Sequence, residues 1–296
     1  MRRWRLVAPL LVGLLLGSSQ AFACASCGSG GDDPLILYPN EVDKIYIGFA
    51  RATAFKNVDA DGRFSTSGGP TAKDTLTLAY GHGFSPRAFV TGTLPWLRNS
   101  RQEATQTSLG DPSLAARYAL VMASMAEPLI PQVQILAGYK QSMTHSIHDS
   151  ADLKTQLDVF GTGFSEAKLG VDVWFGQLDW LAGAAFNLIK PLPHNYDGVR
   201  YEPGLASRST VTAGYVFSTA YKTTFGANLL ARGSLRGDGV VQTDSEQLNH
   251  SVFVTQDWLI SPVESWRLSL SRQAAFGANK NTARSDGVSL AYLRSW

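Results

Sequence analysis

The sequence contains very little cysteine and little charge. Only two of its 296 residues are cysteine, and Asp, Glu, Lys and Arg together make up 17%. Two cysteines cannot form the dense disulfide framework of a small secreted domain, and they are incomplete as a structural zinc site, which needs four ligands. The 26 basic and 24 acidic residues almost balance. Without a clustered basic surface, nothing indicates a nucleic-acid partner.

Long apolar runs are also absent after residue 23. No stretch of 18 apolar residues follows, so the sequence predicts no membrane-spanning helix. Yet 44% of the residues are hydrophobic, and 28 glycines accompany 7 Trp, 10 Tyr and 14 Phe. A chain with this composition but no long runs spreads its apolar residues over every second position. That distribution is what the strands of a membrane barrel require.

The N-terminus has the features of a secretory signal peptide. Three arginines precede an apolar run at residues 6–16, and small residues flank Phe22 in the Ala-Phe-Ala that ends at Ala23. We therefore predict a signal peptide over residues 1–23, removed on export to the outer membrane of a Gram-negative bacterium. Cleavage leaves Cys24 first, a position where lipid can be attached, but bulky Phe22 favours ordinary cleavage. Without its arginines the mature chain has a net charge near −1.

Residues 24–42 form a segment rich in cysteine and glycine, which we expect to lie in the periplasm. Cys24 and Cys27 are in Cys-x-x-Cys spacing. They form a local disulfide or remain free thiols, contact a soft metal such as copper, or dock a partner. Gly28 stands where a c-type haem site needs histidine, so no cofactor is predicted. The glycine run predicts either a mobile tail or a plug entering a barrel.

Residues 43–296 predict an all-β fold, a transmembrane antiparallel up-and-down barrel of about twelve strands. Apolar residues alternate with polar or small ones: Leu76, Leu78 and Tyr80, for example, oppose the intervening threonines and alanine. The expected strands are 43–57, 73–83, 87–97, 112–122, 132–143, 165–175, 179–190, 206–217, 222–233, 248–260, 265–276 and 286–296. Long polar loops alternate with short turns between them. Outer-membrane barrels have this arrangement, with long loops outside and both chain ends in the periplasm.

The two parities of these strands predict two environments. Outward residues contact outer-membrane lipid, and we expect interfacial aromatic girdles from Tyr80, Trp96, Tyr139, Trp174, Tyr215, Trp258, Trp266, Tyr292 and Trp296. Trp174, however, shares its parity with Gly170 and Asp172. The last strand, ending on Trp296, resembles the closing strand of outer-membrane barrels, which implies handling by the barrel-assembly machinery. Arg294 lies on its apolar parity, near the membrane edge, where a long cationic side chain can snorkel.

The opposite parity carries polar and charged residues that must avoid lipid, because a charge facing mid-membrane costs roughly 2–4 kcal/mol. Such residues either line a pore or form an internal salt-bridge network that holds the barrel rigid. The candidates for pore lining are Arg117, Gln134, Lys140, Lys168, Asp172, Asn228, Arg232 and Arg267.

The middle of the chain resembles a known family. Residues 79–96 read AYGHGFSPRAFVTGTLPW, residues 109–114 read LGDPSL, and the turn-like FGTG and YEPG follow at 160–163 and 201–204. These motifs are similar to those of outer-membrane transporters of the meta-pathway of phenol degradation, in patches over residues 73–235. The resemblance implies a barrel channel that passes small hydrophobic or aromatic molecules.

The remaining polar cluster lies in the longest external loop. His145, His148, Asp149 and Asp152 offer metal-ligand types at close spacing, although a solvated polar loop is the more frequent explanation of such a cluster. No nucleophile, hydrolase or phosphate-binding motif occurs, so we do not predict an enzyme. The leading hypothesis is a passive outer-membrane channel for small solutes. The alternative is a structural barrel that sheathes or docks a periplasmic or multihaem electron-transfer partner.

Overall fold

The computed structural model describes residues 35–37, 41–122, 130–151, 156–176, 179–218 and 220–296. All regular structure in these residues is β-strand. None of them belongs to a helix long and apolar enough to cross a membrane.

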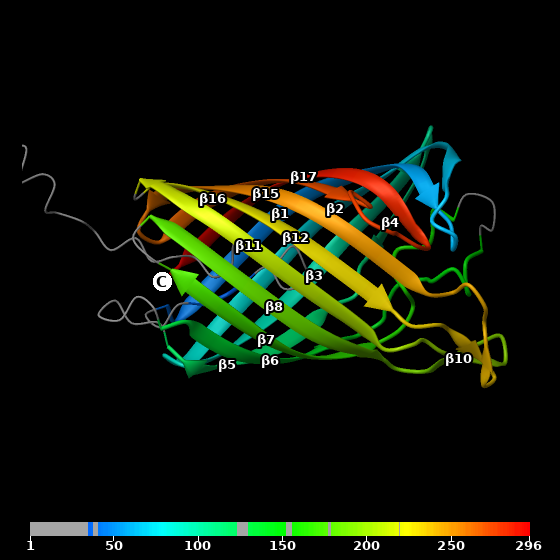
Figure 1. Ribbon diagram of the computed structural model, residues 1–296, viewed down its shortest axis with the longest axis horizontal. Helices are drawn as coiled ribbons and strands as arrows, with labels where there is room; N and C mark the ends of the chain where they lie inside the picture. Colours follow the sequence, from blue (N-terminus) through cyan, green and yellow to red (C-terminus); the bar gives the residue numbers. More distant parts are fainter. Residues whose placement is uncertain (1–34, 38–40, 123–129, 152–155, 177–178, 219) are drawn as a thin grey trace, which may run out of the picture.

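Twelve antiparallel strands form a closed barrel (Figure 1). Neighbouring strands along the chain pair with each other, and β1 pairs with β17 to close the wall. Both the fold class and the strand count predicted from alternation are confirmed. The barrel strands are β1 (Asp43–Val58), β2 (Phe64–Ser85), β3 (Ala88–Arg101), β5 (Ser113–Val121), β6 (Gln132–Lys140), β7 (Glu166–Gly176), β8 (Trp180–Pro191), β11 (Ala206–Ser218), β12 (Tyr221–Arg232), β15 (Gln247–Ser261), β16 (Glu264–Gln273) and β17 (Thr282–Ser295).

Five further strands lie in segments that the sequence predicts as loops. β4 (Ala104–Leu109) forms a hairpin with the second half of β3 and belongs to the same sheet. A separate four-stranded sheet joins two loops, from β9 (His194–Tyr196), β10 (Val199–Glu202), β13 (Arg236–Gly237) and β14 (Val240–Val241). β2 also begins at Phe64, nine residues before the predicted strand, because it pairs with the far end of β1.

Long loops and short turns lie at opposite ends of the barrel. β4 and β10 are at the end away from the C-terminus (Figure 1). At the other end the chain returns to its start: the backbone N–H of Trp296 donates to the carbonyl of Asp43 (3.1 Å), and the N–H of Asp43 donates to the carbonyl of Trp296 (3.1 Å). We call these the long-loop end and the short-turn end.

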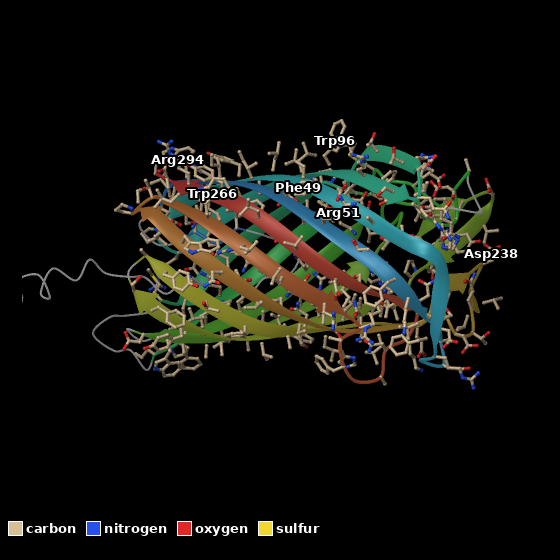
Figure 2. The ribbon with its side chains drawn as sticks, turned by 90° about the horizontal axis from the view of Figure 1, so that it is seen from above. Phe49, Arg51, Trp96, Asp238, Trp266 and Arg294 are labelled. Atoms are coloured by element: carbon tan, nitrogen blue, oxygen red, sulfur yellow. The ribbon has the colours of Figure 1, made fainter. Side chains whose placement is uncertain are left out.

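The outer wall is apolar, with aromatic residues at its edges. The predicted girdle residues other than Trp174 all lie on it: Tyr292 is partly buried, and the others are 36–55% exposed. Figure 2 shows Trp266 toward the short-turn end and Trp96 toward the long-loop end. Arg294 lies at the short-turn rim, where its guanidinium is 3.6 Å from the carboxylate of Glu264. This geometry fits a cationic side chain at a membrane edge.

Trp174 corrects the girdle prediction. It is only 8% exposed and belongs to an inward cluster with Phe89 and Leu181. Its ring covers Gly183 on the paired strand β8, where a Cβ atom would come within 2.3 Å of the indole. The parity it shares with Asp172 decides its direction, and the glycine opposite supplies the space.

Candidate functional site in the barrel lumen

All eight predicted pore-lining residues lie on inward-facing positions. Arg117, Gln134, Asp172 and Arg267 are buried, at 2–9% exposure, whereas the other four are partly exposed. They do not form one group, because they separate into two levels along the barrel axis. Whether they line a conducting pore stays a prediction.

The level near the short-turn end consists of buried ion pairs. The Arg117 guanidinium donates to the Asp172 carboxylate across the intervening strand β6. Asp257 accepts a hydrogen bond from Arg267 Nε (2.7 Å) and has Lys222 Nζ at 3.4 Å. Removing one member of such a pair leaves a buried charge uncompensated. These residues therefore fit the rigid salt-bridge network of the sequence analysis.

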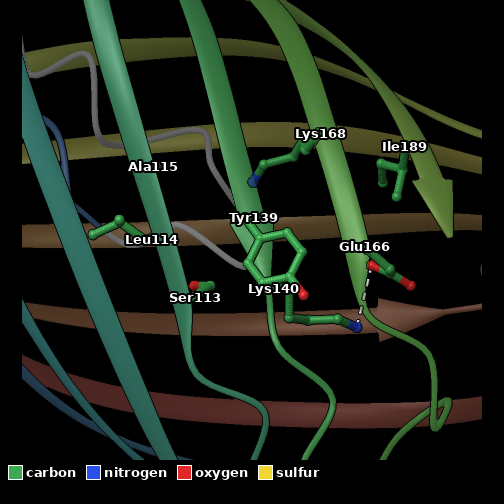
Figure 3. Close-up of a pocket in the computed structure, with 8 residues that line it drawn as sticks. All are labelled: Ser113, Leu114, Ala115, Tyr139, Lys140, Glu166, Lys168 and Ile189. Atoms are coloured by element: carbon green, nitrogen blue, oxygen red, sulfur yellow. Dashed lines mark ion pairs between the residues drawn. The ribbon is translucent and has the colours of Figure 1, made fainter. Parts of the chain in front are cut away.

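The level near the long-loop end is centred on Glu166. Its carboxylate is 3.1 Å from Lys140 Nζ and 3.0 Å from the Arg232 guanidinium, which comes from β12, three strands away in the wall. Figure 3 shows the Lys140–Glu166 pair beside a narrow hollow that Lys168 also lines. Lys140 Nζ also lies 3.8 Å from the Asp111 carboxylate, so Lys140 and Arg232 face two carboxylates here, and Lys168 adds a third cation. Asn228, nearby on β12, accepts a hydrogen bond from Thr210 Oγ1 (2.6 Å).

The short-turn end of the lumen holds a piece of the N-terminal segment. Leu35, Ile36 and Leu37 are 0–3% exposed, and the apolar side chains packed around them are inward residues of the wall. The Lys44 ammonium donates to the carbonyl of Ile36 (3.2 Å). Of the two alternatives for residues 24–42, a tail or a plug, the position of residues 35–37 inside the barrel fits the plug. The wall residues that pack around residues 35–37 are Tyr46, Ala79, Phe89, Trp174, Leu181, Ala291 and Leu293.

Gly81 provides the space for Leu37. A Cβ atom at position 81 would be 2.5 Å from Leu37 Cδ1 and 3.3 Å from Thr91 Cγ2. The first distance is too short for any real contact, so a side chain on β2 at this level would compete directly with Leu37. The glycine-marked hairpin that carries the family resemblance thus forms part of the seat for the segment.

The loop between β6 and β7 covers the opposite end of the lumen. Leu157, Phe160 and Phe164 in this loop are at most 5% exposed. Lys73 Nζ on β2 donates to the carbonyl of Phe160 (2.8 Å), and Asn99 Nδ2 on β3 donates to the carbonyls of Leu157 (3.0 Å) and Val159 (2.9 Å). Because β2 and β3 are two or more strands away from β6, these bonds hold the loop across the mouth.

The predicted metal candidates in that loop are engaged in other contacts. Asp149 accepts from Ser146 and lies 3.0 Å from His145 Nδ1. Burial raises the pKa of the Asp149 carboxyl, but the hydrogen bonds from Ser146 and His145 outweigh it and hold that pKa below its ordinary value. Asp152 lies outside the described residues, as do Cys24 and Cys27. Within the residues that are described, no three metal-ligating side chains gather.

His148 belongs to an aromatic cluster instead. Its ring stacks on Tyr201 of β10 with the centroids 4.2 Å apart, and Tyr196 and Phe164 complete the cluster. Burial among these rings lowers the pKa of His148 and raises that of the Tyr196 phenol. The cluster joins the mouth loop to the small sheet of β9 and β10.

Sequence reasoning missed three of these features. The apolar triplet at residues 35–37 stands out in a polar, glycine-rich segment and could have indicated a docked element. Asp111 follows Gly110 in the quoted motif, and its carboxylate accepts from the backbone N–H groups of Met143 and Thr144. Lys73 and Glu166 have no sequence signal, since their partners are 87 and 66 residues away.

Comparison with solved structures places this fold among outer-membrane barrels. The COG4313 outer membrane channel from Pseudomonas putida F1 superimposes with a TM-score of 0.74 at 14% identity, covering 90% of this chain and 99% of that one. The KdgM porin and the NanC porin are more distant: both have TM-scores of 0.47, with 8% and 9% identity. No protein-family model matches the sequence, and no curated protein matches it either. The likeness to the channel shows the barrel fold.

Proposed function

We propose that this protein is an outer-membrane channel for the passive passage of small hydrophobic or aromatic solutes. The long-loop end faces the exterior, the short-turn end faces the periplasm, and residues 1–23 are removed on export. The fold shared with an outer-membrane channel supports the membrane location, and so does the apolar outer wall with its aromatic edges. We assign the barrel no catalytic role.

The observation that carries the solute class is the apolar surface that residues 35–37 cover in the periplasmic half of the lumen, beside the buried ion pairs of that half. Phe89, Trp174 and Leu181 point inward at the level of residues 35–37, and Leu136 and Leu293 are buried inward residues as well. A water-filled porin has a polar interior. When residues 35–37 leave their seat, the surface they uncover favours an apolar or aromatic molecule over a sugar or an ion.

Passage then requires two movable covers. At the outer mouth, a few hydrogen bonds hold the β6–β7 loop to Lys73 and Asn99. At the periplasmic end, three apolar side chains and the hydrogen bond from Lys44 to the Ile36 carbonyl hold residues 35–37. Both covers are local pieces of chain, so the twelve-stranded wall stays intact as they move.

Entry of the apolar dye 1-N-phenylnaphthylamine into intact cells tests this proposal. The dye fluoresces once it has passed the outer membrane and reached lipid. Cells with the full chain should take it up faster than cells without it, whereas liposomes carrying the chain should not swell in arabinose. Rapid arabinose entry without faster dye uptake would identify a hydrophilic pore and overturn the proposed solute class.

A further inference from the structure

The outer wall carries a group of charged residues on one side, toward the long-loop end. Arg51 on β1 and Asp74 on β2 face outward in register, with Nε and Oδ1 3.7 Å apart, and Arg98 on β3 is opposite Asp74. Arg272 and Asp286 pair on β16 and β17 (2.6 and 2.8 Å). We call these residues, with Arg284, the outer-wall basic patch. It has four cations and two anions.

Arg284 has an unusual position in this patch. Its guanidinium lies 5.6 Å from the centre of the Phe64 ring and 5.9 Å from that of Phe55. Its Nε is buried and has no hydrogen-bond acceptor among the described residues. Aromatic rings hold this cation in place without neutralising it.

On β17, the patch begins closer to the short-turn end than the outward charge of β8 does. On β17 three apolar outward positions, Tyr292, Leu290 and Val288, separate Arg294 at the short-turn rim from Asp286, whereas on β8 five outward positions, from Trp180 to Leu188, precede Lys190. With about 3.3 Å per residue and a tilt near 40°, this makes the apolar wall roughly 10 Å shorter on the β17 side. Figure 2 shows Arg51 just beyond Phe49 and level with Trp96.

Charges at this height face the boundary between acyl chains and headgroups, not bulk water. The two carboxylates offset two of the four cations, and the apolar surface below the patch remains in contact with acyl chains. A partner must therefore present an anionic group directly above hydrocarbon. An arginine fork binds a phosphate in bidentate geometry, which makes a phosphorylated lipid the complementary ligand.

We propose that the outer-wall basic patch binds the phosphate groups of a phosphorylated glycolipid in the outer leaflet of the outer membrane. Arg51 and Arg98 bind phosphate on either side of Asp74, and Arg284 supplies a further donor. The acyl chains of the bound lipid cover the apolar wall below the patch, and the bound lipid fixes the orientation of the barrel. This inference rests on the proposed membrane location and orientation, but not on channel activity.

Native mass spectrometry of the folded full-length mature chain in neutral detergent tests the site. The chain is titrated with bisphosphorylated lipid A and, separately, with the same lipid after removal of its phosphates. The test variant is R51Q/R98Q. Its matched control is R87Q/R294Q, which removes two exposed arginines at the short-turn end, one of them facing a carboxylate as Arg51 does.

Phosphorylated lipid should bind the parent chain and the control equally, and R51Q/R98Q roughly thirtyfold more weakly. Dephosphorylated lipid should bind all three chains alike and weakly. Equal binding of the two lipids, or equal losses in both double variants, would overturn the proposal. Loss of a dimer in R51Q/R98Q without lipid preference would identify the patch as a contact between two copies. A heat-dependent gel shift in every variant confirms folding. Neither the lipid titration nor the gel shift depends on dye uptake.

Discussion

A valine at Gly81 should expel the N-terminal segment from the lumen. Its Cβ atom would occupy a position 2.5 Å from Leu37 Cδ1, and its methyl groups would extend further into the same space. The barrel tolerates the change, because Leu37 and Thr91 are the nearest side chains there. The segment can move away from the clash, whereas the hydrogen-bonded wall cannot.

The contacts of the segment set the size of the effect. Burying three aliphatic side chains contributes about 2 kcal/mol each. Ordering three residues costs about 1.5 kcal/mol each. The difference, about 1.5 kcal/mol, protects the backbone of residues 35–37 by roughly tenfold. Losing the seat of Leu37 removes an amount of that order, so the protection should disappear.

Hydrogen–deuterium exchange with mass spectrometry measures this protection. Peptides that cover residues 35–37 should exchange roughly tenfold faster in Gly81→Val than in the parent chain. Gly92→Val is the matched control: it lies on the same hairpin, and a Cβ atom there meets nothing within 4 Å. Unchanged exchange in Gly81→Val, or equal acceleration in both variants, would refute the reasoning that Gly81 forms the seat.

Three further outcomes are expected. Leu268→Arg, on the outward parity, should destabilise the folded barrel by about 2–4 kcal/mol in urea titrations in liposomes, whereas its neighbour Ser269→Arg should be tolerated; equal damage would mean that the parities are reversed. Lys73→Met should free the mouth loop, so limited proteolysis should cut between residues 156 and 165 sooner than in the parent chain, and an unchanged rate would show that this bond does not hold the loop. The lowered pKa of His148 means that the folded loop disfavours the protonated ring. The ordered state of the loop is therefore retained above the ordinary histidine pKa and lost as pH falls through the lowered value. Proteolysis of the loop should be faster at pH 5 than at pH 7.5, and His148→Phe should remove that difference.

Alternation along the chain predicted the barrel well because lipid and lumen impose a period of two on every strand. Each of the twelve predicted strands has a counterpart, and all eight residues proposed for the inward face lie on it. Trp174 shows that residue type alone does not predict which face a side chain occupies. Its aromatic ring suggested an interfacial position, but its parity in the strand and the glycine opposite place it inside the barrel.

The closures of the lumen could not be predicted, because they depend on contacts between distant parts of the chain. Lys73 meets Phe160 across 87 residues, and residues 35–37 meet Trp174 and Leu181 from outside the barrel sequence. Local patterns carry no record of such contacts. The small sheet of β9, β10, β13 and β14 was missed for the same reason, since its outer strands come from two different loops.

Single-channel conductance in a planar bilayer tests the central claim most directly, namely that a barrel channel is closed by its own N-terminal segment. The mature chain is compared with a deletion of residues 24–40, which keeps Glu41 paired to Lys44 and the hydrogen bonds of Val42 and Asp43 to Trp296. The full chain, which is covered at both ends, should open rarely, and the deletion, which keeps only the β6–β7 loop as a cover, should give discrete conductance steps more often. Identical traces from the two chains would contradict the account.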